Sequence, residues 1–93
     1  MEFEWDPKKE AKNIRNHKVA FSEAATVFAD TFSTTVPDPD HSEDEDRYLL
    51  IGLSQCSGLL LVPHAERGER IRIIRAQSLT PAEREAYEEE TNR

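Results

Sequence analysis

The stretch from Leu59 to Gln77 constrains the fold most, because it has the pattern of two β-strands that fold back at Arg67-Gly68-Glu69. Glycine is the residue that takes the positive φ angle that such a reversal needs. Leu, Val and Ile on either side of the reversal suit a pleated and packed surface. The stretch therefore predicts a β-hairpin on which the rest of the chain is organised.

The charges of this hairpin favour one register. A two-residue loop at Arg67-Gly68 would place two glutamates opposite each other, and like charges directly opposite are unfavourable. A three-residue loop instead places Glu66 opposite Arg70 and His64 opposite Arg72. We therefore expect the three-residue loop.

This register gives the two faces of the hairpin different characters, because side chains alternate across a strand and all even-numbered positions then share one face. The odd-numbered face is predominantly apolar and is expected to form the core. The even-numbered face is apolar at its base and charged near the turn. Its charged rim, where chemistry could take place, consists of His64, Glu66, Arg70 and Arg72.

Size and charge limit what the chain can be. A length of 93 residues fits one domain, residues 1–93, with a single modest core. The net charge of -7 argues against broad coating of nucleic acid, which needs a basic footprint. Many acidic residues are concentrated at Glu43–Asp46 and Glu83–Glu90, so a local basic site remains compatible with this charge. A basic protein partner would be attracted to the acidic surface.

The cysteine content and the first residues of the chain indicate the cellular compartment in which the protein works. Cys56 is the only cysteine, so the chain forms no internal disulfide and a reducing compartment is the simplest interpretation. The longest apolar run, near Leu59–Val62, is far shorter than a membrane span. The first residues, Met1–Trp5, lack the pattern of a signal peptide. We therefore expect a cytoplasmic protein with no membrane association.

The N-terminal third predicts a short strand at Phe3–Trp5 and then a helix from Pro7 to about His17, with Asp6 as its N-cap. This helix is the most basic segment of the chain. Its basic face is either simply solvated or a shelf for phosphates or for an acidic partner. The candidate phosphate contacts on it are Lys8, Lys12 and Arg15.

The later elements are predicted from turn and capping signals. They are a helix from Glu23 to about Phe28 capped by Ser22, a strand at Thr31–Val36, a strand at Arg47–Gln55 with a loop at Cys56–Gly58, the two hairpin strands, and a helix from the capping box Thr80–Glu83 to about Glu90. The fold class is therefore α+β, with a short first strand and two helices, a four-strand antiparallel sheet and a C-terminal helix. Helices should cover one face of this sheet.

An acidic segment separates the second and third of these strands. Asp38, Asp40, His41 and Glu43 could act as ligands for a hard metal, but their order does not match the calcium-loop pattern. A solvated loop is the preferred interpretation. No metal site and no cofactor is expected.

Taken in order, several segments resemble the BrnT family, the toxins of a type II toxin–antitoxin system. The matching segments are Phe3–Pro7, Asn13–Phe28 including His17, Pro37–Arg47, His64–Ile74, and the positions Thr80, Glu83, Arg84 and Tyr87. The resemblance implies a RelE-like ribonuclease fold and a metal-independent endoribonuclease that slows translation. It also implies a cognate antitoxin, BrnA, which forms a hetero-oligomer with the toxin and connects it to operator DNA.

The chain departs from the family pattern at two places. Lys18 stands where the family commonly has Gly, and Arg75-Ala76-Gln77 stands where a Ser-Ala-Arg run is common. An arginine near this point is implied to contact the scissile phosphate. Gln77 is neutral, and Arg75 points to the same face two residues earlier, so Arg75 is the candidate for this role.

Metal-free RNA cleavage needs a base, an acid and a cation at the phosphate. The candidates for proton transfer are His64 and Glu66. Those for the cation are Arg70, Arg72 and Arg75. Tyr48 could stack on a base or donate its hydroxyl. The competing interpretation is that the rim consists of ordinary cross-strand pairs on the surface.

Two functions therefore remain open. One is a toxin that cleaves RNA and is neutralised by its antitoxin. The other is a weakly active or inactive toxin-like module that mainly binds its antitoxin and tunes repression of the operon.

Overall fold

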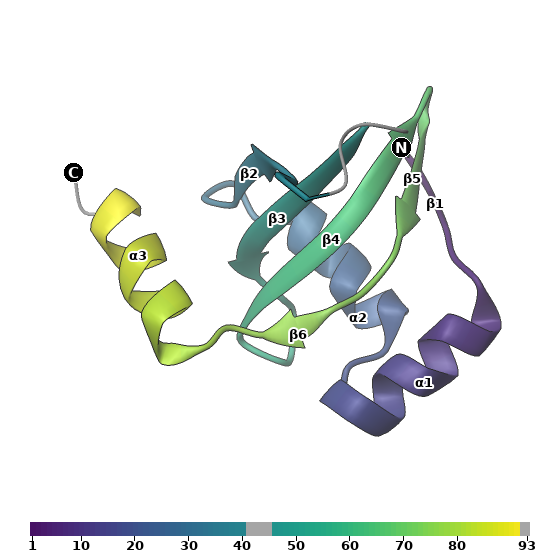
Figure 1. Ribbon diagram of the computed structural model, residues 1–93, viewed down its shortest axis with the longest axis horizontal. Helices are drawn as coiled ribbons and strands as arrows, with labels where there is room; N and C mark the ends of the chain where they lie inside the picture. The colour runs from purple at the N-terminus through teal and green to yellow at the C-terminus, as the bar shows by residue number, and fades with distance from the viewer. Residues whose placement is uncertain (41–45, 92–93) are drawn as a thin grey trace.

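The computed structural model describes residues 1–40 and 46–91 and has an α+β fold with three α-helices and a mixed sheet (Figure 1). The elements follow in the order β1 (Glu2–Glu4), α1 (Pro7–His17), α2 (Phe21–Thr26), the 3₁₀ turn η1 (Val27–Ala29), β2 (Thr34–Pro37), β3 (Arg47–Leu53), β4 (Leu59–Arg67), β5 (Arg70–Ile73), β6 (Gln77–Ser78) and α3 (Pro81–Thr91).

The sheet has the strand order β1-β5-β4-β3-β2, and β6 pairs with β4 beyond the end of β5. Strands β2 to β5 form an antiparallel series, whereas β1 joins β5 in parallel. The two-residue strand β6 was not expected from the sequence. Within the described residues the sheet is therefore mixed, with β4 at its centre.

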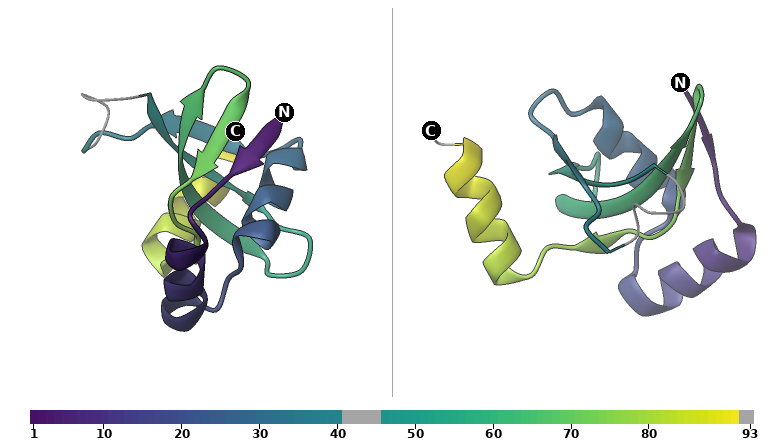
Figure 2. Two further views of the ribbon diagram at one scale, coloured as in Figure 1. Left: turned by 90° about the vertical axis from the view of Figure 1, so that its right-hand side faces the viewer. Right: turned by 45° about the horizontal axis from the view of Figure 1, so that its top comes forward.

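The core lies between the even-numbered face of β4 and the segment formed by α2 and η1. Leu60, Val62 and Ile73 of the sheet pack against Phe21 and Val27. Figure 2 shows α2 on one side of the sheet and α3 on the other. The expectation that odd-numbered positions of both hairpin strands would form this core is wrong for β4, whose even-numbered residues lie there, and is confirmed for Ile73 of β5. The two strands differ because the turn between them is shorter than expected, which places even positions of β4 beside odd positions of β5.

The β4–β5 turn contains two residues, Gly68 and Glu69, and its register pairs Arg67 with Arg70. Gly68 has a φ angle of 62°, as its glycine predicts. The three-residue loop was inferred from charges within the hairpin alone. Carboxylates from β1 overturn that inference, since parallel pairing places Glu2 beside Arg70 and Glu4 beside Arg72.

The β3–β4 connection is longer than expected. Leu53 pairs with Leu59, so five residues connect the strands, and Gly58 takes a φ angle of 75°. Glu23 of α2 holds this connection, because its Oε2 accepts hydrogen bonds from the backbone N–H groups of Cys56 and Ser57 at 2.5 and 3.0 Å. These hydrogen bonds lower the pKa of Glu23. As a result Tyr48 lies opposite His64.

The boundaries of α1 are confirmed, and the N–H of Lys8 donates to Oδ1 of the cap residue Asp6 at 2.9 Å. Helix α2 begins at Phe21, earlier than expected, and Ser22 does not cap it. The cap comes from α1 instead, since Oε2 of Glu10 accepts from the N–H of Phe21 at 2.8 Å. A carboxylate from another element thus replaces the local cap.

Helix α3 has the expected capping box. The N–H of Thr80 donates to Oε1 of Glu83 at 2.9 Å, and the N–H of Glu83 donates to Oγ1 of Thr80 at 3.2 Å. A hydrogen bond from the Tyr87 hydroxyl to the carbonyl of Phe32 links α3 to the rest of the molecule at 3.0 Å. Every helix in the described ranges is too short or too polar to cross a lipid bilayer.

Candidate functional site

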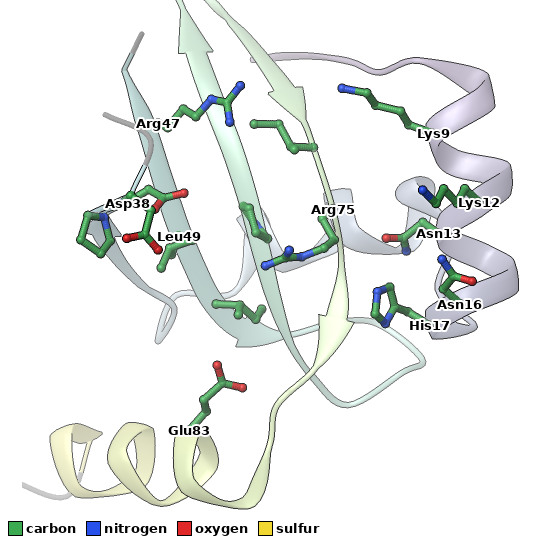
Figure 3. Close-up of a pocket in the computed structure, with 15 residues that line it drawn as sticks. Lys9, Lys12, Asn13, Asn16, His17, Asp38, Arg47, Leu49, Arg75 and Glu83 are labelled. Atoms are coloured by element: carbon green, nitrogen blue, oxygen red, sulfur yellow. Dashed lines mark hydrogen bonds between the residues drawn. The ribbon is translucent and has the colours of Figure 1, made fainter. Parts of the chain in front are cut away.

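A groove of about 560 Å³ lies over the odd-numbered face of the sheet, opposite the core (Figure 3). Its floor is apolar and is formed by Leu49 of β3, Leu61 and Pro63 of β4, and Ile74. Helix α1 borders one side and the start of α3 borders another. The sheet face that α2 and η1 leave uncovered therefore carries a concave surface.

Basic side chains converge on this groove although the chain as a whole is acidic. Helix α1 contributes Lys9, Lys12 and His17, which face the sheet in Figure 3. Arg75 extends across the floor, and Arg47 approaches from the start of β3. Such a cluster attracts anions, and a guanidinium group matches the geometry of a phosphate.

Carboxylates stand at the other side of the groove. Asp38 is only 7% exposed, and its Oδ1 accepts a hydrogen bond from the N–H of Asp40 at 3.0 Å. The backbone N–H of Asp38 donates to the carbonyl of Arg47 at 3.0 Å, which fixes the loop to β3. Glu83 points into the groove from the first turn of α3. The groove thus combines cations with groups that can accept protons.

Arg75 reaches the groove because strand pairing is interrupted at residues 74–76. Pro63 has no N–H to donate, so β5 ends at Ile73 and pairing with β4 resumes only at Gln77. Across this gap the carbonyl of Pro63 accepts from the N–H groups of Ile74 and Arg75 at 3.0 and 3.4 Å. Pro63 therefore acts mainly on the neighbouring strand β5.

His64 lies outside this groove, on the core side of the sheet, and is 2% exposed. Its ring packs edge-to-face against Phe28 and stacks with Tyr48, with centroid distances of 4.9 and 6.0 Å. Nδ1 lies 3.0 Å from the carbonyl of Val62, so this nitrogen carries the hydrogen. Burial lowers the pKa of His64, and the nearby Val62 carbonyl and Glu66 oppose this effect.

The expected rim does not form, because even-numbered residues of β4 lie opposite odd-numbered residues of β5. Glu66 lies opposite Ile71, whereas Arg72 lies opposite Ala65, so the two charges are on different faces. Nε2 of His64 is 3.9 Å from Oε2 of Glu66. The expectation that His64, Glu66, Arg70 and Arg72 share one open face is therefore wrong.

The two rim arginines face carboxylates of β1 instead. Nε of Arg70 lies 3.5 Å from Oε2 of Glu2. Nη1 of Arg72 donates to Oε2 of Glu4 at 3.1 Å, and both side chains are 30% exposed. These pairs connect the N-terminal strand to the hairpin.

Two of the residues singled out from the sequence line the groove, namely Arg75 and Lys12. Lys8, Arg15 and Tyr48 do not line it, and Tyr48 lies on the other face. The groove also contains residues that were not among the catalytic and RNA-binding candidates, namely Lys9, His17, Asp38, Arg47 and Glu83.

One sequence signal could have found part of this missing set. Lys9, Lys12 and Asn16 follow one another at helical spacing, which marks a single face of α1. The sequence cannot show that this face borders the sheet. His17 was interpreted as a helix C-terminal residue, and Asp38 as part of a solvated loop.

No group of three or more His, Cys, Asp or Glu side chains within residues 1–40 and 46–91 could hold a metal ion. Asp38 and Asp40 belong to the acidic segment weighed as a metal site, while His41 and Glu43 lie outside the described residues.

Comparison with known proteins identifies the family. Residues 5–83 match the family model described as the ribonuclease toxin BrnT of a type II toxin–antitoxin system. A solved structure, the Brucella abortus ribonuclease toxin BrnT, is similar at a TM-score of 0.68 and 22% sequence identity, covering 86% of this chain and 97% of that one. That likeness shows a shared fold. No curated protein matches the sequence. Because the family model spans most of the chain, this protein belongs to the BrnT family of type II toxin–antitoxin systems.

Proposed function

We propose that this chain is an endoribonuclease toxin that cleaves RNA without a metal ion and thereby slows translation, and that the groove over the odd-numbered sheet face is its active site. One observation carries the proposal: Arg75 lies in a concave surface together with Lys9, Lys12 and His17, in a chain of net charge -7. Family membership supplies the class of activity, since the family is one of ribonuclease toxins.

The groups in the groove suit cleavage by the neighbouring 2′-hydroxyl. In this reaction the 2′-oxygen attacks phosphorus, the bond to the 5′-oxygen breaks, and a 2′,3′-cyclic phosphate and a 5′-hydroxyl form. Arg75, assisted by Lys12, would hold the phosphate and stabilise the charge that develops on it. A carboxylate, Asp38 or Glu83, would accept the proton of the 2′-hydroxyl. His17 would act as the general acid that donates a proton to the leaving oxygen.

The roles first assigned to His64, Glu66, Arg70 and Arg72 remain predictions, and the geometry of the described residues supports them less. A buried imidazole on the core face has no access to a polynucleotide on the other face. Arg70 and Arg72 face carboxylates that would compete with a phosphate. The proposal therefore rests on Arg75 among the residues first selected for catalysis.

A type II toxin is paired with an antitoxin, and this family implies such a partner. We infer that the antitoxin is BrnA-like, that the two proteins form a hetero-oligomer in the cytoplasm, and that the toxin reaches DNA only through it. The exposed glutamates of α3 support attraction to a basic partner. The RelE-like relationship of the fold is part of the same proposal, supported by two N-terminal helices that precede a predominantly antiparallel sheet.

A second candidate function is supported by Gln77. This residue lies opposite Leu61 on the groove side of β6 and offers a neutral amide where the family commonly has arginine. A toxin-like module that has lost catalytic strength and mainly binds its antitoxin would show this replacement.

Two measurements test these proposals. Expression without the antitoxin should arrest growth, and the purified protein should cleave RNA in the presence of EDTA. Arg75→Ala should slow cleavage about tenfold or more and weaken the growth arrest accordingly. The double variant His64→Gln, Arg72→Gln serves as the matched comparison and should retain cleavage in proportion to its folded fraction. If Arg75→Ala still cleaves RNA and the double variant does not, the active site lies at the rim that contains His64 and Arg72. Antitoxin binding by a wild-type protein that leaves RNA intact would favour the second function.

A further inference from the structure

Asn13 is a buried polar residue that the proposed chemistry does not use. It lies in α1 and is 5% exposed, and the hydrogen bonds of its side chain go to backbone atoms outside its own helix. Nδ2 donates to the carbonyl of Val19 at 2.8 Å and to the carbonyl of Ala76 at 2.9 Å, and Oδ1 accepts from the N–H of Ala76 at 3.1 Å. The side chain therefore forms a two-point clamp on Ala76.

This clamp replaces strand pairing at the interruption described above. Pro63 cannot donate a ladder hydrogen bond, and residues 74–76 run between β5 and β6. A buried backbone N–H and carbonyl left without partners there would cost stability. The amide of Asn13 supplies both a donor and an acceptor, as a neighbouring strand would, so the backbone beside Arg75 has one defined position.

The same clamp sets the width of the groove. Asn13 belongs to the helix that carries Lys9, Lys12 and His17, and Ala76 directly follows Arg75. Figure 3 shows Asn13 between α1 and the segment that carries Arg75. The hydrogen bonds between Asn13 and Ala76 thus connect helix α1, which carries the basic side chains, to the segment that carries Arg75.

We infer that Asn13 is a positioning residue that places Arg75 at the distance from α1 at which both can bind one phosphate of an RNA chain. The inference rests on the proposed function of the groove. Asn13 itself makes no contact with the substrate. Its removal leaves Arg75 in the chain but frees the backbone that directs it.

A double-mutant cycle tests this role, because coupled residues are non-additive whereas independent ones add. Single-turnover cleavage of a single-stranded RNA oligonucleotide is measured for the wild type, Asn13→Ala, Arg75→Ala and the double variant. Arg75→Ala should slow cleavage about tenfold or more, as expected for the loss of a hydrogen bond to a charged group. Asn13→Ala should slow it severalfold in the wild-type background and have no further effect when Arg75 is absent.

Two controls separate positioning from folding. Val27→Ala removes apolar contacts on the core side of the sheet, away from the groove. Its cleavage rate is compared with that of Asn13→Ala under conditions in which both variants have lost the same amount of Tm. Val27→Ala should leave the cleavage rate of the folded protein unchanged. If Asn13→Ala does not fold, Asn13→Asp replaces it in the cycle, since one carboxylate oxygen can still accept from the N–H of Ala76.

The outcomes are distinct. Equal effects of the Asn13 change with and without Arg75 would overturn the positioning role and leave the proposed function intact. An Arg75→Ala variant that cleaves at the wild-type rate would overturn the proposed function, and the inference with it.

Discussion

Lys18 shows how a single backbone angle can carry a stability cost. It is the C-cap of α1, with φ 62° and ψ 28°, and it is the non-glycine residue with positive φ among the described residues. The left-handed conformation costs an L-residue roughly 1–2 kcal/mol, whereas glycine adopts it freely and loses about 0.5–1 kcal/mol of chain entropy on folding. The glycine that the resemblance implies at this position would take this angle without the steric cost.

Lys18→Gly should therefore raise the free energy of unfolding by about 0.5–1 kcal/mol. Urea denaturation of both proteins measures the change. Lys18→Ala is the control, because it also loses the hydrogen bond from Nζ to the carbonyl of Arg15 but keeps a Cβ atom. Equal stability of the glycine and alanine variants would show that the backbone angle carries no such cost.

His64 gives the protein a pH dependence of stability. Burial lowers its pKa below the ordinary value of 6.5, so the unfolded chain binds this proton more readily than the folded one. The free energy of unfolding should therefore decrease as the pH falls through 6.5 towards the lowered pKa, and change no further below it.

Urea denaturation between pH 5 and 8 checks this dependence. The slope in that window should be smaller for His64→Gln than for the wild type. Parallel stability curves for the wild type and His64→Gln would contradict the assignment.

Among the elements, β3 packs closely on η1 through a glycine. A Cβ atom at Gly52 would lie 2.8 Å from Cβ of Ser33 and 2.9 Å from Cγ1 of Val27. Both neighbours are held in place, Val27 by the core and Ser33 by its N–H bond to the carbonyl of Asp30. The close approach of strand and helix therefore depends on the absence of a side chain.

Gly52→Ala should lower the free energy of unfolding by about 1–3 kcal/mol, the usual cost of overpacking. Thermal denaturation measures the loss. The control Leu53→Ala changes the next residue, whose side chain is 56% exposed, and should alter stability by less than about 0.5 kcal/mol. A Gly52→Ala protein as stable as the wild type would mean that the two elements can separate without cost.

Helix α3 depends on its cap more than on packing. Its described side chains are mostly exposed, and it is tied to the molecule by the hydrogen bond between Tyr87 and Phe32. Thr80→Ala should destabilise the helix by about 1 kcal/mol. Amide hydrogen exchange should become faster in residues 84–88 and remain unchanged in β4. Faster exchange in β4 as well would show that α3 and the sheet unfold together.

At the scale of the whole molecule, an acidic protein can bind RNA only where its cations are concentrated. The groove supplies Lys9, Lys12, Arg47 and Arg75, whereas the net charge of -7 repels a polyanion elsewhere. Contacts with three or four phosphates release about 0.7 counterion each from a single strand, so log Kobs should fall with log[salt] at a slope of about -2 to -3.

Titration of a non-cleavable single-stranded oligonucleotide at several salt concentrations measures this slope. Lys12→Ala should reduce its magnitude, and Lys8→Ala, on the same helix but outside the groove, should leave it unchanged. A larger slope that responds equally to both variants would indicate a diffuse binding surface.

The sequence by itself determined the elements whose signals are local. The capped helix α1, the capping box of α3, the glycines in both turns and the α+β class all follow from residues within a few positions of each other. The basic character of α1 could be inferred in the same way, because it depends on residue type and position in the chain. Arg75 became a candidate through the resemblance to the BrnT family.

Only the tertiary structure decided which side chains meet. Pairing of β1 with β5 brought Glu2 and Glu4 beside Arg70 and Arg72, and it made a two-residue turn between β4 and β5 acceptable. This turn shifts the register of the two strands by one residue from the expected one, and His64 lies in the core as a result. Pro63 and Asn13 together placed Arg75 in the groove, from positions far apart in the chain. A strand has a period of two, so one unforeseen long-range contact exchanges its two faces, and no local pattern contains that information.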